Sequence, residues 1–279
     1  MVAPYSSALL LPAIASLGAA LQSSAAPATG PATGRANTPL FSTDFSTPLD
    51  VVPEASLLGP NGSRVKMPSA LWVIESQGHN STASTASGNL TIANRGSHCV
   101  LWLNRRFPPQ IDIRFSFMPV NVTNGLAIVF FSAAPPNATA TGSIFDLSLP
   151  PRHGDYANYF NGLATYSDSY FRPDGRTGPG DCDRNATTGL CIANLRKDPG
   201  FHLVASGNDL VGGHRPANGR AFEVRVVRLG GQIVLSVDGA PEVTWTDPSP
   251  LGGGYIGLRQ MSNTGQASYT HLDVYPASA

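Results

Sequence analysis

A run of hydrophobic alternation lies in the C-terminal third and limits the chain to folds built on antiparallel sheet. Residues 222–237 read FEVRVVRL, then GG, then QIVLSV, and apolar side chains recur at every second position over 222–226 and again over 233–237. This period places each of these two sets on one face of its strand. Gly230–Gly231 joins the two runs and Asp238–Gly239 follows the second, and glycine supplies the positive φ that tight hairpin turns require. The pattern predicts consecutive β-hairpins.

Shorter runs of the same kind occupy the rest of the chain. LWVIES, NLTIAN and CVLWLN follow one another at short intervals, IDIRFSFMPV alternates with Ile111, Ile113, Phe115 and Phe117 on one face, and LAIVFFSA is apolar throughout. YIGLRQM and YTHLDVY end the chain. With no helix longer than two turns and no repeat of fixed period, we predict an all-β domain, a jelly-roll sandwich of two antiparallel sheets with LAIVFFSA as a central strand.

The N-terminal region reads as a targeting segment. Ser7 to Leu21 is rich in alanine and leucine and is too short to span a bilayer comfortably, and small residues follow it. We expect a signal peptide over 1–25, a flexible linker over 26–38 and a single domain over 39–279. N-glycosylation sequons support a secretory route and begin at Asn61, Asn80, Asn89, Asn121, Asn137 and Asn185.

Cysteine and charge content narrow the chemistry. Cys182 and Cys191 bracket a short loop and are expected to form a disulfide, while Cys99 lies in an apolar run and is expected to be buried and inert. Lysine and arginine number 18 and so do aspartate and glutamate, so we expect neither a nucleic-acid nor a membrane partner. We predict no zinc site and no cofactor; a structural calcium ion stays open.

The stretch from Gly142 to Gly213 gathers aromatic, amide and basic side chains. It includes Tyr156, Tyr159, Tyr166, Tyr170, Arg172, Arg196, Lys197 and His202. Such groups, interleaved along loops and strand ends, favour a polar site that stacks on and hydrogen-bonds a carbohydrate or small-molecule ligand. For each of these tyrosines, edge packing of the sandwich is an equally good explanation, and a solvated sheet edge is the alternative for the cations.

Four segments of this chain resemble the YesU-like family of concanavalin A-like lectin/glucanase jelly-roll proteins. They are SIFDLSLPPRHGDYANYFNGLATYSDSYFR, ANLRKDPGFHLVASGNDL, LGGGYIGLRQM and THLDVY, and the resemblance runs from about Phe145 onward. It implies a lectin-type sandwich, with bacterial relatives associated with the breakdown of pectin-like polysaccharides. Fold transfers between relatives more safely than function does.

Position by position, the resemblance implies a set of residues at or near the concave face. They are Tyr159, Tyr170, Arg172, Asn194, Arg196, Lys197, His202 and Gln260. The family pattern has histidines where this chain has Phe160 and Ser167, and a basic residue where it has Pro173. The loss of these imidazoles removes support for an inherited acid–base role, so this chain can have kept the scaffold and changed the chemistry.

Three functions follow from these residues. The first is a secreted enzyme acting on acidic, uronate- or rhamnose-containing polysaccharide, in the lyase version with Arg172 and Arg196 neutralising a uronate carboxylate and His202 or Tyr170 removing the adjacent proton. The retaining-glycosidase mechanism is not supported, because the paired carboxylates it needs are missing from the sequence. The second function is a lectin-like module that binds glycans without turnover.

The third function is a cyclase or pericyclase of fungal-type secondary metabolism, of the hetero-Diels–Alderase type. In that case Phe160, Phe171 and Tyr166 form an apolar wall, and an Arg or Lys polarises an oxygen of an aromatic or terpenoid intermediate. Most of the rate would then come from orientation of the substrate.

Overall fold

The predicted hairpins are present as three consecutive strands, β12 (Phe222–Leu229), β13 (Gln232–Val237) and β14 (Ala240–Thr246). They belong to a computed structural model that describes residues 38–137, 142–173, 184–212 and 219–278. The predicted signal peptide and nearly all of the linker lie outside the described residues. Gly230 has a φ of 59°, and Asp238 and Gly239 have φ of 49° and 78°. These positive angles match the predicted turns and give neighbouring strands the twist a hairpin needs.

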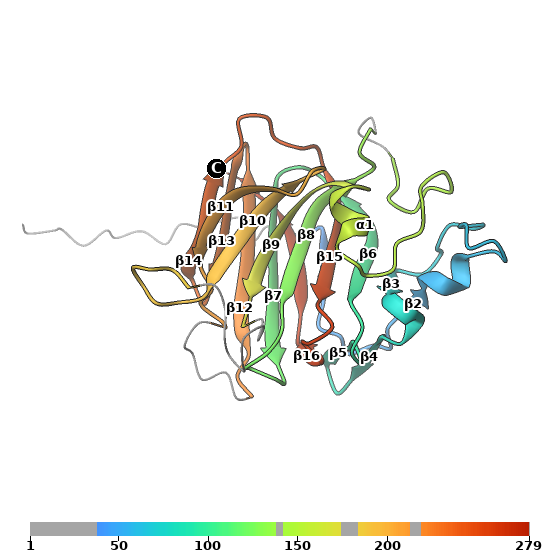
Figure 1. The fold of residues 1–279 in the computed structure, drawn as a ribbon, viewed down its shortest axis with the longest axis horizontal. Coiled ribbons are helices and arrows are strands. Elements are labelled where there is room, and N and C mark those ends of the chain that lie inside the picture. Colours follow the sequence, from blue (N-terminus) through green and yellow to red (C-terminus); the bar gives the residue numbers. More distant parts are fainter. Residues whose placement is uncertain (1–37, 138–141, 174–183, 213–218, 279) are drawn as a thin grey trace, which may run out of the picture. The chain divides into compact units, whose positions relative to one another are not determined.

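Two sheets make up the domain (Figure 1). The nine-stranded sheet contains β14, β13, β12, β7 (Ile111–Pro119), β16 (Gln266–Tyr269), β5 (Asn89–Ala93) and β4 (Thr82–Ala86) in that order, with β17 (Leu272–Pro276) beside β7 and β1 (Phe41–Thr43) beside β17. The eight-stranded sheet contains β11 (His202–Asn208), β10 (Ile192–Asp198), β9 (Ala164–Phe171), β8 (Ala127–Ala134), β15 (Gly254–Gln260), β6 (Cys99–Phe107), β3 (Trp72–Ser76) and β2 (Val51–Pro53).

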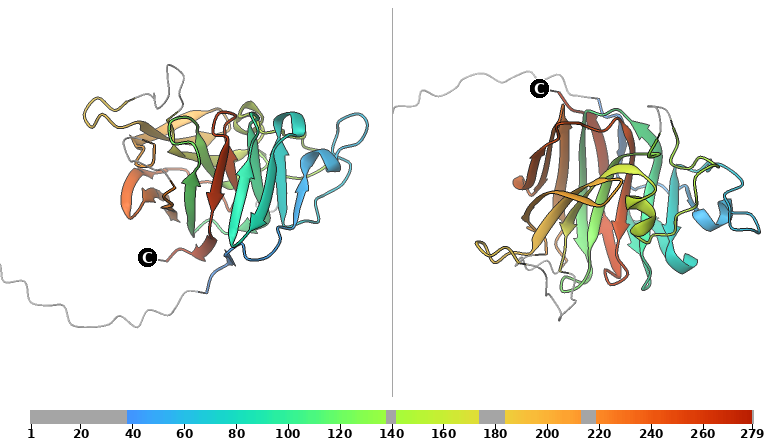
Figure 2. Two further views of the ribbon diagram at one scale, coloured as in Figure 1. Left: turned by 90° about the horizontal axis from the view of Figure 1, so that it is seen from below. Right: turned by 45° about the horizontal axis from the view of Figure 1, so that its top comes forward.

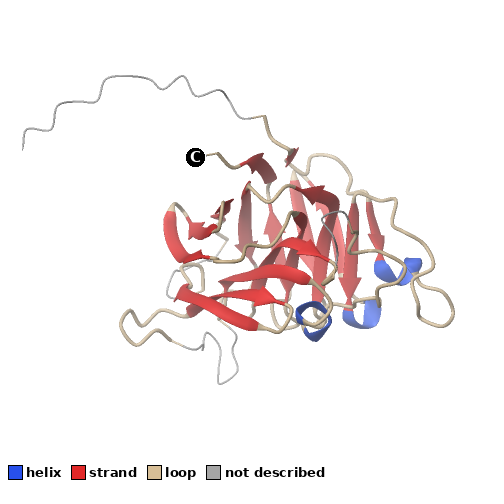
Figure 3. Ribbon diagram, turned by 90° about the horizontal axis from the view of Figure 1, so that it is seen from above, coloured by secondary structure: helices blue, strands red, loops and turns tan. Residues whose placement is uncertain are grey.

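All strand pairs are antiparallel except β2 with β3. The helices in the described residues are short: η1 (Glu54–Leu57), η2 (Gln77–His79) and α1 (Ala157–Phe160). Figure 2 shows the two sheets from two further sides, and in Figure 3 the strands form the body of the domain with the helices at its border. The predicted all-β sandwich is confirmed.

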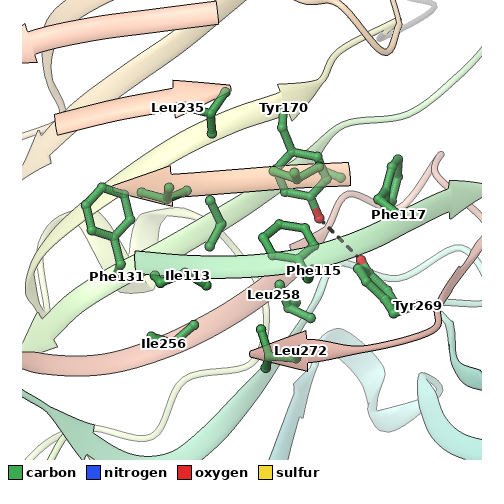
Figure 4. Close-up of a cluster of buried hydrophobic side chains, with 14 of the residues drawn as sticks. Ile113, Phe115, Phe117, Phe131, Tyr170, Leu235, Ile256, Leu258, Tyr269 and Leu272 are labelled. Carbon is green, nitrogen blue, oxygen red and sulfur yellow. Dashed lines mark hydrogen bonds between the residues drawn. The ribbon is translucent and has the colours of Figure 1, made fainter. Parts of the chain in front are cut away.

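The core between the sheets is built from inward-facing side chains of β7 and β9 (Figure 4). Phe115 and Phe117 of β7 pack edge-on against Tyr170 of β9, with ring centroids 5.2 and 5.0 Å apart. The Tyr170 and Tyr269 hydroxyls are 3.3 Å apart in this core. The predicted alternation of the strand at Ile111 is therefore confirmed, since its apolar face is fully buried.

A second apolar cluster lies on the outer face of the eight-stranded sheet. Phe130 of β8 and Trp102 of β6 stack there at 5.5 Å, and Tyr159 from α1 packs on both rings. The prediction that LAIVFFSA is a central strand buried on both sides is confirmed, because Val129 and Phe131 face the first core while Phe130 faces the second. The cluster also fixes the position of α1 on this face.

The structure departs from the predicted strands at YTHLDVY and at strands that the sequence did not indicate, among them β2 and β4. The run YTHLDVY is split into β16 and β17, because the Thr270 backbone N–H and side-chain hydroxyl both hydrogen-bond the Ser116 hydroxyl at 2.6 Å. Strand β4 was not predicted, since TASTA has no large apolar side chain to mark an inward face. It lies at the edge of its sheet.

Asp168 of β9 is buried between the sheets, and neither carboxylate oxygen has a hydrogen-bond partner among the described residues. Burial raises its pKa from 3.8 to about 8. The folded protein therefore keeps this proton at pH values where the unfolded chain releases it. Stability from this group is complete below about pH 4 and is lost as the pH rises towards about 8.

We expect Asp168→Asn to remove this pH dependence. The variant should gain stability relative to the parent chain as the pH rises from 5 to 8.5, by a few kcal/mol in total. Urea unfolding at several pH values measures the difference, with the partly exposed Asp273→Asn as a control. An equal pH dependence in the parent and in Asp168→Asn contradicts the assignment.

Candidate functional site

The outer face of the eight-stranded sheet carries a polar cavity beside the second cluster. Within β9, Tyr166, Asp168 and Tyr170 point inward, so Ser167 and Ser169 point outward. The strand register sets Ser167 opposite Arg196 of β10 and opposite Phe130 of β8, and sets Ser169 opposite Ile128. Side chains opposite one another share a face, so these residues form one patch across three strands.

The cavity has a volume of about 350 Å³, and we call it the arginine pocket. Its lining residues are Leu126, Ile128, Tyr156, Ser167, Ser169, Arg172, Asn194, Arg196 and Phe201. Three strands, β8, β9 and β10, and the loops beside them thus contribute to one hollow, which is the usual construction of a ligand site.

Arg172 and Asn194 are linked on one wall of the pocket. With the Asn194 amide oriented to suit its neighbours, its oxygen accepts a hydrogen bond from Arg172 Nη1 at 2.7 Å and its nitrogen donates to Ser206 Oγ at 2.9 Å. The Arg172 backbone N–H donates to Asp209 at 2.5 Å, so the strand end is fixed as well. The guanidinium is therefore held in a defined orientation next to the cavity.

Arg196 lies on the neighbouring wall and has no carboxylate within ion-pair distance in the part of the chain that the structure describes. Its Nη1 donates to the Phe201 carbonyl at 3.0 Å, and its guanidinium lies 3.7 Å from the centre of the Phe201 ring. Burial lowers its pKa, and the nearby Arg172 acts in the same direction. Asp198 acts on Arg196 through space and forms no ion pair with it among the described residues. Two arginines at one cavity are the side chains that suit an anionic group.

Aromatic rings form the rim of the pocket. Tyr156, Phe160 and Phe201 pack on one another, with centroids 5.0 to 5.8 Å apart. Phe201 has a φ of 59°, a conformation that costs energy for a bulky side chain. That conformation holds its ring over Arg196, and 40% of the residue stays exposed to solvent.

Tyr156 joins the pocket to the second apolar cluster. Its hydroxyl and the Ser167 hydroxyl are 2.6 Å apart, and its ring also packs on Phe130. Burial raises the pKa of Tyr156 to about 12, so the hydroxyl is protonated at neutral pH. It can donate a hydrogen bond to a ligand oxygen, and it is a poor base there.

Three of the predicted site residues, Arg172, Asn194 and Arg196, meet at the pocket. Phe160 lies just behind its rim, in contact with Tyr156 and Phe201. Arg172 follows the end of β9 and Arg196 lies in the adjacent strand β10, so both guanidinium groups come to one cavity. Their role towards a ligand stays a prediction.

Tyr170 and Gln260 do not reach the pocket. Both are fully buried between the sheets, where Gln260 Nε2 lies 3.4 Å from the Tyr269 hydroxyl and the Tyr170 hydroxyl lies 3.3 Å from it. Period two explains the difference, since these residues alternate with the outward-facing ones. A catalytic role for Tyr170 and a ligand contact by Gln260 therefore lack a route to solvent.

Tyr166 and Lys197 also face away from the pocket. The Tyr166 hydroxyl donates to Asp247 at 2.5 Å, and Lys197 Nζ forms an ion pair with the same carboxylate at 2.8 Å. Phe171, the other member of the expected apolar wall, is fully buried in the first core. These three residues hold the strands together rather than line a cavity.

Tyr159 and His202 do not line the pocket either, because the first is buried beneath the surface and the second is exposed outside the cavity. Tyr159 is fully buried in the second cluster, and its hydroxyl donates to Glu75 at 2.7 Å. His202 is exposed at the start of β11 and does not line the pocket. Its neighbours Phe201 and Leu203 are also 40% and 52% exposed, so His202 does not alternate with buried apolar residues.

The sequence interpretation included Tyr156 in the binding stretch without giving it a role, and it did not select Ser167, Ser169 or Phe201 as site residues. The signal for the serines was present in ATYSDSYF: once the tyrosines are assigned to the core, the serines must face outward. Phe201 carries no such signal, because its position depends on the turn between β10 and β11. Leu126 and Ile128 were assigned only to a buried strand.

Other predicted features have these places. The sequon asparagines Asn61, Asn80, Asn121 and Asn137 are exposed, and Asn89 and Asn185 are partly exposed.

Cys99 is buried and free, with its pKa raised to about 11 by burial. Cys182 lies outside the described residues, so its disulfide with Cys191 stays a prediction. The described residues contain no cluster of three His, Cys, Asp or Glu side chains that could hold a metal ion, and none of their helices is long and apolar enough to cross a membrane.

Comparisons with known proteins agree with this architecture. A family model described as a domain of unknown function (DUF1961) matches residues 58–274. The Bacillus subtilis (strain 168) protein named "Uncharacterized protein YesU" is 30% identical over 230 residues, which cover 80% of this chain and 97% of that protein. A Bacillus subtilis crystal structure, described as a protein of unknown function with a galectin-like fold, superposes with a TM-score of 0.61 at 28% identity and covers 74% of this chain and 89% of that one. The resemblance inferred from the sequence is confirmed.

The position of α1, and with it the Tyr156 side of the pocket, depends on a buried ion pair. Arg152 donates to both oxygens of Glu75, at 2.7 and 3.3 Å, and Trp102 Nε1 and the Tyr159 hydroxyl donate to Oε2 at 2.8 and 2.7 Å. Both charged side chains are at most 3% exposed. Removal of one partner would leave the other charge buried and unpaired.

We therefore expect Glu75→Ala to lower the free energy of unfolding by about 3 to 5 kcal/mol. Urea unfolding measures this loss. Glu75→Gln keeps the shape of the side chain, so its free energy of unfolding should fall between that of the parent chain and that of Glu75→Ala. As a control, Glu223→Gln removes an exposed carboxylate and should change stability by less than about 0.5 kcal/mol. A loss below about 1 kcal/mol in Glu75→Ala would contradict a structural role for this pair.

Proposed function

Because the chain belongs to the DUF1961 family, with a YesU-like jelly roll, we propose that it binds an acidic saccharide in the arginine pocket. The observation that carries this proposal is the pair Arg172 and Arg196 on two walls of one cavity, with no carboxylate within ion-pair distance of Arg196 among the described residues. A guanidinium presents several N–H donors in a plane and binds a carboxylate through two of them. A uronate carboxylate fits this geometry.

The remaining lining suits the neutral part of a sugar. Ser167, Ser169 and Asn194 offer hydroxyl and amide groups to ring hydroxyls, and Tyr156 and Phe201 offer aromatic faces. Sugar rings have apolar C–H faces and polar edges, so a site that combines stacking with hydrogen bonds suits them. About 350 Å³ is at the small end of ligand pockets, so the pocket accepts one or two sugar units rather than a long segment.

Binding is better supported than elimination. A lyase needs a base beside the uronate carboxylate, and neither His202 nor Tyr170 lines the pocket. Tyr156 is present, and its pKa of about 12 suits a hydrogen-bond donor or a general acid. Formation of an unsaturated product from any uronate polymer, followed by its ultraviolet absorbance, would nevertheless establish the lyase function.

A second candidate function rests on the apolar part of the same wall. Leu126, Ile128 and Phe201 line the same cavity as the two arginines. This combination suits a compact apolar intermediate that carries one ionised or polarised oxygen, as in a cyclase or pericyclase of secondary metabolism. Turnover of a polyene or quinone-type metabolite, with no binding of saccharides, would favour this candidate.

The test of the proposed function is Arg196→Gln. We expect the variant to bind galacturonate and its oligomers at least tenfold more weakly in isothermal titration at pH 7, because it loses a charge-assisted hydrogen bond. The control is Arg105→Gln, which removes an exposed arginine from β6 of the same sheet and should leave affinity unchanged. If the parent chain binds neutral sugars as strongly as uronates, the assigned role of the arginines is refuted.

A further inference from the structure

Arg259, at the centre of the eight-stranded sheet, shares the face of the arginine pocket. It stands opposite Ile128 of β8 in the register of β15, and Ile128 lines the pocket. Since opposite residues of neighbouring strands share a face, Arg259 is the next side chain along the same row. It is only 2% exposed.

The guanidinium of Arg259 is unusual in its lack of partners. Its Nε and Nη1 have no hydrogen-bond partner among the described residues, and Nη2 lies 3.5 Å from His98 Nδ1. That nitrogen already accepts from the Ser262 backbone N–H at 3.2 Å, so His98 contributes no negative charge. Asp155 acts on Arg259 through space and forms no ion pair with it.

The other buried arginines of the described residues show the contrast. Arg64 pairs with Glu54 at 2.5 Å and Arg152 pairs with Glu75 at 2.7 Å, and Arg228 donates to Ser132 and to two backbone carbonyls. A buried charge without such partners is costly, so its presence calls for an explanation in function. An anionic group of a ligand would supply the missing partner.

The Tyr156 ring separates Arg259 from the pocket. Its centre lies 5.0 Å from the Arg259 guanidinium, and its hydroxyl is held by Ser167. Arg259 and Arg196 both act on the ionisation of this hydroxyl, so the tyrosine lies within the field of both cations. A turn of this one ring, with ligand hydroxyls taking over the bond to Ser167, would open Arg259 to the cavity.

The two arginines come from strands that are not neighbours. Arg196 is on β10 and Arg259 is on β15, with β9 and β8 between them. Three strand spacings of about 4.8 Å separate the two backbones by roughly 14 Å. An oligosaccharide with two carboxylates can place one at each arginine.

We propose that Arg259 anchors a second carboxylate of the ligand, so that the site takes an oligouronate lying across strands β10 to β15. This inference rests on the proposed saccharide function and specifies its ligand class. The first carboxylate lies at Arg196 and the second at Arg259, and Tyr156 moves aside when the longer ligand binds.

The experiment compares galacturonic acid with di- and trigalacturonic acid by isothermal titration. In the parent chain we expect an oligomer to bind about tenfold or more tightly than the monomer, because it gains a second charge-assisted contact. Arg259→Met, which keeps the apolar volume, should lose this gain and retain the affinity for the monomer. Arg196→Gln should weaken every ligand.

Arg259→Lys keeps the positive charge, so it should retain part of the gain in affinity from monomer to oligomer. Thermal unfolding of both variants shows whether either substitution disturbs the fold. An oligomer gain that persists in Arg259→Met overturns the inference and leaves the proposed function intact. Equal affinity of the parent chain for the monomer and the oligomers also overturns the inference on Arg259 and leaves the proposed function intact. Failure of the parent chain to bind any uronate refutes both.

Discussion

Ser167 and Ser169 face the arginine pocket on the outer side of the eight-stranded sheet because their neighbours in β9, Tyr166, Asp168 and Tyr170, point inward between the two sheets. A strand has only two faces, so the side chains that fill the core also fix which ones remain to form a surface. Tyr170 is held by Phe115 and Phe117 from the opposite sheet, and this packing sets the rotation of β9. The floor of the arginine pocket is thus a consequence of how the core is filled.

The outer face of the same sheet is divided into a covered part and an open part. Trp102 and Phe130 are covered by Tyr159 and the rest of the segment that carries α1, and the ion pair of Glu75 and Arg152 holds that segment in place. Tyr156 lies at the border, in contact with Phe130 on one side and with the pocket on the other. The second cluster therefore stabilises the domain and also determines how far the pocket extends towards β15.

The fold could be predicted because its signals are local. Alternation at 222–237 and at Ile111, together with glycine at the turns, is enough to specify antiparallel strands, and the structure contains them. Which side chains of residues 156–170 belong to the core and which to the site could not be predicted from such local signals. The tyrosines that made residues 156–170 look like a binding stretch lie mostly in the core, because a large aromatic ring with one hydroxyl suits either environment.

Non-local contacts explain the rest of the difference. The Glu75 and Arg152 pair joins residues 77 positions apart, and Phe201 reaches Arg196 only through the turn between β10 and β11. Arg172, Asn194 and Arg196 were placed by resemblance to the family, and the pocket brings them together. The resemblance therefore predicted the strand positions of the charged and amide residues. The aromatic rim depends on the conformation of a turn, and no local sequence pattern predicts that conformation.

The balance of charge over the whole chain conceals a local excess. Lysine and arginine equal aspartate and glutamate in number, which argued against an anionic partner of large size. On the outer face of the eight-stranded sheet, however, neither Arg196 nor Arg259 has a carboxylate within ion-pair distance among the described residues, and burial lowers the pKa of both. Electrostatic attraction falls off within about a Debye length in salt, so such an excess acts only on a group that enters the pocket. A small, local, partly buried cluster of cations selects an anion by contact rather than by long-range steering, and this is the property expected of a site for discrete carboxylates on an otherwise neutral sugar.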